Sequence, residues 1–94
     1  MAILDAVFRA LSDPKRREIL RLLRGGDLTA GEIAGRFPVA RSTLSEHLGV
    51  LRDAGLVVTA RRGSVVVYSL HVAAYEELVA AVMDALGVGV DRAG

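Results

Sequence analysis

Apolar residues in the first half of the chain recur at every third or fourth position, the spacing that places side chains on one face of an α-helix. This spacing predicts four successive helices, over residues 3–11, 14–24, 30–37 and 41–54. In the fourth helix, Leu44, Leu48 and Leu51 fall within a narrow sector of the circumference. We therefore expect these three leucines to be buried, with the other side of that helix facing outward.

Residues that start and stop helices stand at the boundaries of these segments. Ser12-Asp13-Pro14 puts a capping residue before a proline at the first helical position, where the missing proline N–H costs nothing. Thr29 and Glu32 have the spacing of a capping box, and Pro38 disfavours helical geometry at the residue before it. Gly55 is expected to take the left-handed conformation that ends the fourth helix.

The periodicity changes after the fourth helix. Residues 56–60 and 65–70 are rich in β-branched side chains and flank a turn at Gly63-Ser64, which predicts a two-stranded hairpin. Helical spacing returns over residues 72–86, and residues 87–94 are expected to form a frayed tail. The predicted fold is mostly α with a β-hairpin wing: a winged helix-turn-helix of order α-α-α-α-β-β-α, in one domain over residues 1–94.

Charge is distributed unevenly along the chain, although the net charge is only +1. Residues 1–70 hold eleven Lys and Arg against seven Asp and Glu, whereas residues 71–94 hold one Arg against four acidic residues. Eleven of the twelve basic residues are Arg, whose planar guanidinium can bond phosphate at two points. This distribution is compatible with binding of an anionic polymer, and it is also compatible with an ordinary solvated surface.

Composition excludes several classes of protein. With no cysteine, the chain has no disulfide, no thiolate zinc site and no thiol nucleophile. The start of the chain lacks the features of a secretory signal, and no apolar run is long enough to span a membrane, so we expect a cytoplasmic protein. Hydrophobic residues make up 52% of the chain, more than one small domain needs for its own core. This excess suggests that a partner, such as a second copy, covers some apolar surface.

The helix over residues 41–54 carries short polar side chains opposite its leucines. They are Ser42, Thr43, Ser45, Glu46 and His47, with His47 near the edge of the buried stripe. Small hydroxyl side chains allow close approach to base edges in the major groove, and a helix N-terminus presents free N–H groups to phosphate. For this helix alone, a solvated face is the alternative. The helix and turn before it, and the Arg61-Arg62 pair in the hairpin, favour DNA binding.

These polar residues do not support a catalytic site. Ser45 and His47 lie roughly 200° apart around the helix, so they cannot act as nucleophile and base. The chain contains no glycine-rich phosphate loop or carboxylate pair, and His71 is expected to be a surface residue. We therefore predict that the protein is not an enzyme. Three arginines of the second helix are open to two interpretations, phosphate contact or a solvated face: Arg16, Arg17 and Arg21.

Four segments closely resemble the ArsR/SmtB family of bacterial winged-helix repressors, and most of all its SdpR-like branch. They are ALSDPKRREILRLL (10–23), GDLTAGEIAGRF (26–37), STLSEHLGVLRDAGLV (42–57) and RRGSVVVYSL (61–70). The resemblance implies a homodimer, formed by the first and last helices, that binds an inverted-repeat operator in double-stranded DNA. It assigns groove contacts to Arg41, Ser42, Thr43, Ser45, Glu46 and His47, and wing contacts to Arg61 and Arg62. It assigns dimer contacts to Val7, Phe8, Leu78, Val82 and Leu86.

The chain departs from the family pattern in three ways. The cysteine and histidine ligands of the family's metal sensors are missing from the third and last helices, so no metal or other cofactor is expected. Ala40 replaces the usual serine cap, and Ser64 replaces a basic residue of the wing tip. The resulting prediction is a sequence-specific DNA-binding repressor. The alternatives are a metal- or small-ligand-released repressor of the same family and a winged-helix module that binds only protein.

Overall fold

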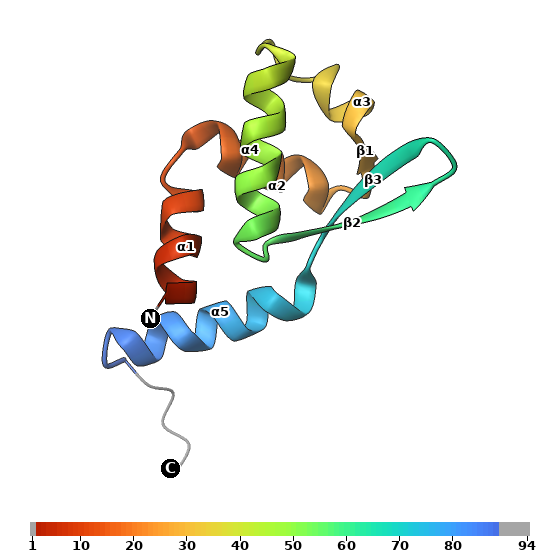
Figure 1. Cartoon of the computed structure of the whole chain (residues 1–94). Helices are drawn as coiled ribbons and strands as arrows, with labels where there is room; N and C mark the ends of the chain where they lie inside the picture. The colour runs from red at the N-terminus through yellow and green to blue at the C-terminus, as the bar shows by residue number, and fades with distance from the viewer. Residues whose placement is uncertain (1, 89–94) are drawn as a thin grey trace.

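The computed structural model describes residues 2–88 (Figure 1). Its elements are, in order, α1 (Ala2–Leu11), α2 (Pro14–Arg24), β1 (Leu28–Thr29), α3 (Ala30–Ala34), α4 (Arg41–Asp53), β2 (Val57–Arg62), β3 (Val65–Leu70) and α5 (Val72–Ala85). The predicted winged helix-turn-helix is confirmed. Of the predicted frayed tail, residues 89–94 lie outside the described residues.

An apolar core joins the helices to the base of the hairpin. Its largest fully buried side chains are Ile19, Ile33, Leu51, Leu56 and Val57. They come from α2, α3, α4, the start of β2 and the residue before it, so the two helices of the helix-turn-helix and the hairpin share one core. Figure 1 shows α4 in the middle of the helices, the hairpin projecting to one side, and α5 lying across the end of the helical group next to α1. The shared core therefore holds the hairpin in a defined position relative to α4.

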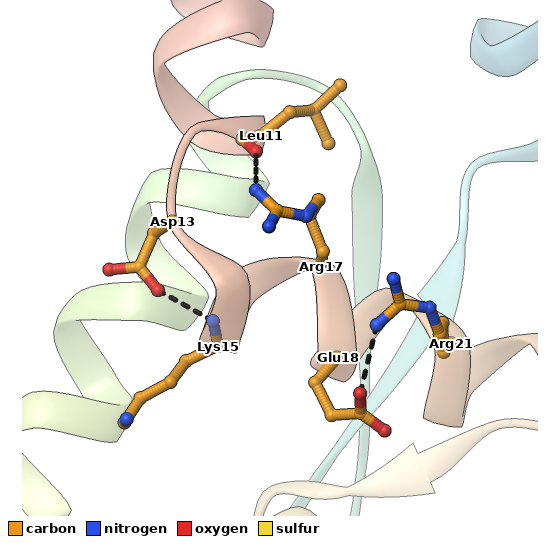
Figure 2. Close-up of polar contacts among 6 residues, drawn as sticks. All are labelled: Leu11, Asp13, Lys15, Arg17, Glu18 and Arg21. Atoms are coloured by element: carbon orange, nitrogen blue, oxygen red, sulfur yellow. Dashed lines mark hydrogen bonds and ion pairs between the residues drawn. The ribbon is translucent and has the colours of Figure 1, made fainter.

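The starts of the helices follow the capping residues of the sequence. Asp13 precedes Pro14, and its carboxylate accepts the N–H of Lys15 at 2.7 Å (Figure 2). At the start of α3, the N–H of Glu32 donates to the Thr29 hydroxyl at 3.0 Å, and the N–H of Thr29 donates to the Glu32 carboxylate at 2.8 Å. The predicted capping box is thus confirmed.

Two glycines with positive φ form the turns around the hairpin. Gly55 has a φ of 80°, and the N–H of Leu56 donates to the carbonyl of Leu51 at 3.0 Å, which is the six-to-one bond of a Schellman motif. Gly63 has a φ of 64° and is the first residue of a two-residue turn, because Arg62 pairs with Val65. A glycine at that position suits a type II′ turn, whose twist matches that of the strands.

The sheet has a strand that the sequence did not predict. β1 is only two residues long and pairs antiparallel with β3, Leu28 opposite Tyr68 and Thr29 opposite Val67. The order of strands is β1-β3-β2, so β3 is central and the hairpin is tied to the start of α3. A second difference is the end of α3 at Ala34 instead of residue 37. Beyond Ala34 the chain continues only as tight turns, with the N–H of Arg36 donating to the carbonyl of Ile33 at 3.0 Å.

Candidate nucleic-acid interface

The first half of α4 presents a polar face to solvent. Its exposed residues are Arg41, Ser42, Ser45 and Glu46, with Thr43 half-buried beside them. Leu44, Leu48 and Leu51 are buried on the opposite side, as predicted from their spacing. α4 is therefore held by its leucines, and its small hydroxyl and charged side chains remain free for an external partner.

The N-terminus of α4 has backbone N–H groups without helical partners. The first bond of the helix runs from the N–H of Leu44 to the carbonyl of Ala40, at 2.9 Å. The N–H groups of Arg41, Ser42 and Thr43 precede it, and Ala40 has no side-chain oxygen to accept from them. An anion such as a phosphate oxygen is the natural acceptor at this position, because the helix dipole also favours negative charge there.

His47 differs from the other predicted groove residues, because the structure buries it. Only 8% of the residue is exposed, and its Nδ1 atom lies 3.2 Å from Nη1 of Arg16 on α2. His47 therefore lies apart from the exposed set, and its assignment to the groove stays a prediction. The helical period places His47 at the edge of the leucine stripe, and the neighbouring α2 covers that edge.

Arg61 and Arg62 are exposed at the end of β2, next to the Gly63-Ser64 turn. They pair with Val66 and Val65 of β3, respectively. Successive side chains of a strand point to opposite faces of the sheet. The two guanidiniums therefore lie on opposite sides of the hairpin, and one DNA strand passing along one side would meet only one of them directly.

Three of the four arginines of α2 make contacts within the protein. Nη1 of Arg17 donates to the carbonyl of Leu11 at 2.7 Å, and Nη1 of Arg21 lies 2.9 Å from the Glu18 carboxylate (Figure 2). Arg16 donates to two further carbonyls at the end of α1. The carbonyls in the last turn of a helix lack helical donors, and cations are favourable there. The contacts with α1 give Arg16 and Arg17 a structural role, whereas the exposed Arg21–Glu18 pair leaves Arg21 on a solvated face.

Among the described residues, positive charge without a carboxylate partner is present on α4 and the hairpin, as it is at several other basic residues of the helices and turns. Within residues 2–88, the two ion pairs are Arg21–Glu18 and Arg52–Asp53, so Arg41, Arg61 and Arg62 have no carboxylate partner in this part of the chain. The pKa of Asp13 is lowered, chiefly because the N–H of Lys15 donates to the carboxylate and further because the backbone N–H and the guanidinium of Arg16 lie nearby. Asp13 therefore stays ionised beside the α2–α4 contact.

A second exposed region is apolar and lies on α1 and α5. None of the residues of α5, from Val72 to Ala85, is fully buried. Val72, Val79 and Leu86 are exposed and spaced seven residues apart, so they share one side of the helix; we call them the α5 stripe. Phe8 on α1 is also exposed. The spacing of Val72 and Val79 was visible in the sequence, although neither was among the predicted dimer residues.

The predicted dimer residues occupy different environments. Phe8 and Leu86 are exposed, Leu78 and Val82 are half-buried, and Val7 is only 5% exposed. Val7 belongs to the core of the protomer, and its assignment to a dimer contact stays a prediction. Val7 and Leu78 also line a groove of about 330 Å³ that reaches from α1 to α5 and includes His71 and Glu77.

Within residues 2–88 there is no group of three or more His, Asp or Glu side chains arranged to hold a metal ion. None of the helices in this part of the chain is both long enough and apolar enough to cross a membrane.

The fold and this site define the class of the protein. A recognition helix with an exposed polar N-terminal half follows a short helix and a turn, and a hairpin carrying two exposed arginines shares its core. This combination is that of a winged helix-turn-helix DNA-binding protein.

Comparison with known proteins identifies the family. Residues 11–60 match the family described as a helix-turn-helix domain. The chain is 46% identical over 68 residues to the transcriptional repressor SdpR of Bacillus subtilis (strain 168), covering 72% of this chain and 76% of that protein. It is 40% identical over 68 residues to the arsenical resistance operon repressor of Staphylococcus xylosus, covering 72% and 65% of the two chains.

Solved structures give the same result. An ArsR-like transcriptional regulator from Rhodococcus sp. RHA1 superimposes with a TM-score of 0.80 at 35% identity, over 92% of this chain and 80% of that one. The chain belongs to the ArsR family of winged-helix transcriptional regulators. It is therefore a DNA-binding regulator of transcription and not an enzyme.

Proposed function

We propose that the protein acts in the cytoplasm as a homodimeric repressor that binds an inverted-repeat operator. In each protomer α4 enters the major groove, and the hairpin contacts the flanking backbone. The observation that carries the proposal is the exposed polar half of α4, next to a helix N-terminus with free N–H groups and opposite a buried leucine stripe. Such a helix can approach base edges without exposing its apolar side.

The proposed contacts divide into two kinds. Ser45 and Glu46 are the candidates for base contacts, since they project from the first turns of α4, where Ser42 and Thr43 can bond the adjacent phosphates. Arg41 and one of the two hairpin arginines are the candidates for electrostatic contacts, because they have no carboxylate partner in the described part of the chain. His47 is left out of both groups because it is buried.

The apolar surface of α1 and α5 supports dimer formation. A mostly apolar helix without a buried residue is incomplete as part of a monomer, and exposed apolar surface of this kind is typical of an interface. In a two-fold dimer both protomers use the same surface patch, so the α5 stripe and Phe8 would be covered in each protomer. To enter successive major grooves, such a dimer has to hold its two copies of α4 about one turn of DNA, 34–36 Å, apart.

Selection of binding sites from random DNA tests the proposal, because it also yields the spacing of the half-sites. The dimer is expected to select an inverted repeat, and if it makes about 6–10 phosphate contacts, its affinity falls by about 10³–10⁵ between 50 and 200 mM salt. Ser45→Ala should weaken binding to the selected site more than binding to random DNA, whereas Arg62→Ala should weaken both equally. Failure to enrich any sequence, with no DNA shift at low salt, would refute the proposed function.

Release by a small ligand is a second candidate, favoured by the groove between α1 and α5. Its volume of about 330 Å³ suits a small molecule. Its lining is mostly apolar, with His71 and Glu77 as polar groups, so a ligand with an apolar body and one polar end would fit. Calorimetry with zinc, nickel and copper, run beside a screen of such small molecules, distinguishes a ligand-released regulator from a constitutive one.

A further inference from the structure

Arg16 connects three parts of the protein through one guanidinium. Its Nε atom donates to the carbonyl of Ala10 at 2.7 Å, and Nη2 donates to the carbonyl of Arg9 at 3.0 Å. Its Nη1 atom lies 3.2 Å from Nδ1 of His47. The side chain therefore starts on α2, binds the end of α1 and reaches the middle of α4.

The chemistry of this contact determines the state of His47. An arginine guanidinium has only donors, so Nδ1 of His47 has to be the acceptor. The imidazole is then neutral, with its proton on Nε2. Because only 8% of His47 is exposed, water offers little replacement for this bond.

The contact is directional, unlike the packing of the leucines. Leu44, Leu48 and Leu51 hold α4 against the core through apolar contacts, which tolerate small rotations of a helix about its axis. His47 directly follows Ser45 and Glu46 in the chain, so a bond to its ring restricts the rotation that would displace these two side chains. Positions that read a ligand need support of this kind, to within about 0.5 Å.

We infer that Arg16 and His47 are positioning residues for DNA recognition, which link the orientation of α4 to the end of α1. The inference rests on the proposed function, in which α4 reads bases and α1 contributes to the dimer. His47 itself touches no base. Its bond to Arg16 sets the angle at which Ser45 and Glu46 meet the groove, and through Arg16 this angle depends on the last turn of α1.

Two substitutions of His47 separate positioning from packing. His47→Leu fills similar space without an acceptor, whereas the amide oxygen of His47→Asn stands close to the place of Nδ1 and restores one. We expect His47→Leu to lower the affinity for the selected operator by about tenfold, the loss typical of a hydrogen bond to a charged group. Its affinity for random DNA should be unchanged, and His47→Asn should recover most of the operator affinity.

Arg17 provides a matched control for Arg16. It caps the same end of α1, through the carbonyl of Leu11 at 2.7 Å, but its bond does not reach α4. Arg16→Gln should reduce the ratio of operator to random-DNA affinity, and combining it with His47→Leu should add no further reduction. Arg17→Gln should lower thermal stability without changing that ratio. Circular dichroism and sedimentation confirm that each variant is folded and dimeric.

The outcomes separate this inference from the proposed function. If the unmodified protein binds no DNA, the proposed function fails and the inference fails with it. If the unmodified protein binds its operator and His47→Leu binds it equally well, only the inference is overturned. Equal losses for His47→Leu and His47→Asn would also overturn it, since packing alone would then account for the role of His47. A changed preference at a single base in His47→Asn would instead show a direct base contact.

Discussion

Substitution of Val79 by Asp tests whether the α5 stripe is the dimer interface. Val79 lies in the middle of the stripe, between Val72 and Leu86, and 58% of the residue is exposed in the protomer. In a two-fold dimer each protomer would cover the other's copy of this residue, so the substitution acts twice. Val79→Asp should therefore shift the protein from dimer to monomer.

The expected magnitude follows from the exposed fraction. Complete burial of a side chain of this type is worth about 1.5–3 kcal/mol. With 58% of Val79 exposed before association, its burial contributes about 1–2 kcal/mol for each protomer, and about 2–4 kcal/mol for the dimer. At 1.4 kcal/mol for each factor of ten, the dimer dissociation constant should rise by about 30- to 700-fold. Two desolvated carboxylates would increase this loss further.

Sedimentation equilibrium over a range of protein concentrations measures the dissociation constant. Ala80→Asp is the matched control, because Ala80 is the exposed neighbour of Val79 and lies on the side of α5 that carries Glu77 and Asp84. It introduces the same charge away from the stripe, and its loss of helix propensity is the larger of the two, because alanine is a better helix former than valine. A dimer of unchanged affinity in Val79→Asp, or an equal effect of Ala80→Asp, would refute the assignment of the interface.

Two further predictions concern α4. Ala40→Ser should raise the free energy of unfolding by about 0.5–1 kcal/mol, because a serine at this position can accept one of the free N–H groups at the helix start. Thermal melts measure it, with Ala80→Ser as a control in a helix interior, and an unchanged melting temperature would contradict it. Glu46→Gln should raise the affinity for random DNA by about two- to fivefold at low salt, since it removes a negative charge that faces phosphate. Glu46→Gln should also relax the base preference at one position, which a repeated selection would measure. Asp53→Asn, at the far end of α4 beside Arg52, is the control and should change neither the affinity for random DNA nor the base preference.

Much of the fold could be predicted because the signals lie within a few residues of one another. The capping box of Thr29 and Glu32, the glycine turn after α4 and the two-residue hairpin turn are all local interactions, and the structure contains each of them. The short strand β1 could not be predicted in this way. Two residues show no alternation, and Leu28 and Thr29 form a strand only because Tyr68 and Val67 lie beside them.

Part of the candidate site could likewise be predicted from local sequence, and part of it depends on tertiary packing. The leucine stripe and the exposed Ser42, Ser45 and Glu46 follow from the period of a helix, which the sequence contains in full. The burial of His47 does not follow from the helical period, because a residue at the edge of the stripe is exposed or buried according to what packs next to it. Val7 was likewise recognisable as apolar, but only the tertiary structure assigns it to the core and not to an outer surface.

By itself, the sequence determined the order of the helices, their caps, the hairpin and the polar face of the recognition helix. These depend on the conformational preferences of neighbouring residues and on the periods of helix and strand. The tertiary structure alone decided that Arg16 and Arg17 of α2 bind the end of α1, and that Arg16 also reaches His47. Such bonds join residues six and thirty-one positions apart. The donor and acceptor atoms of these bonds come together only after the helices have packed, so the periodicity of the sequence cannot predict them.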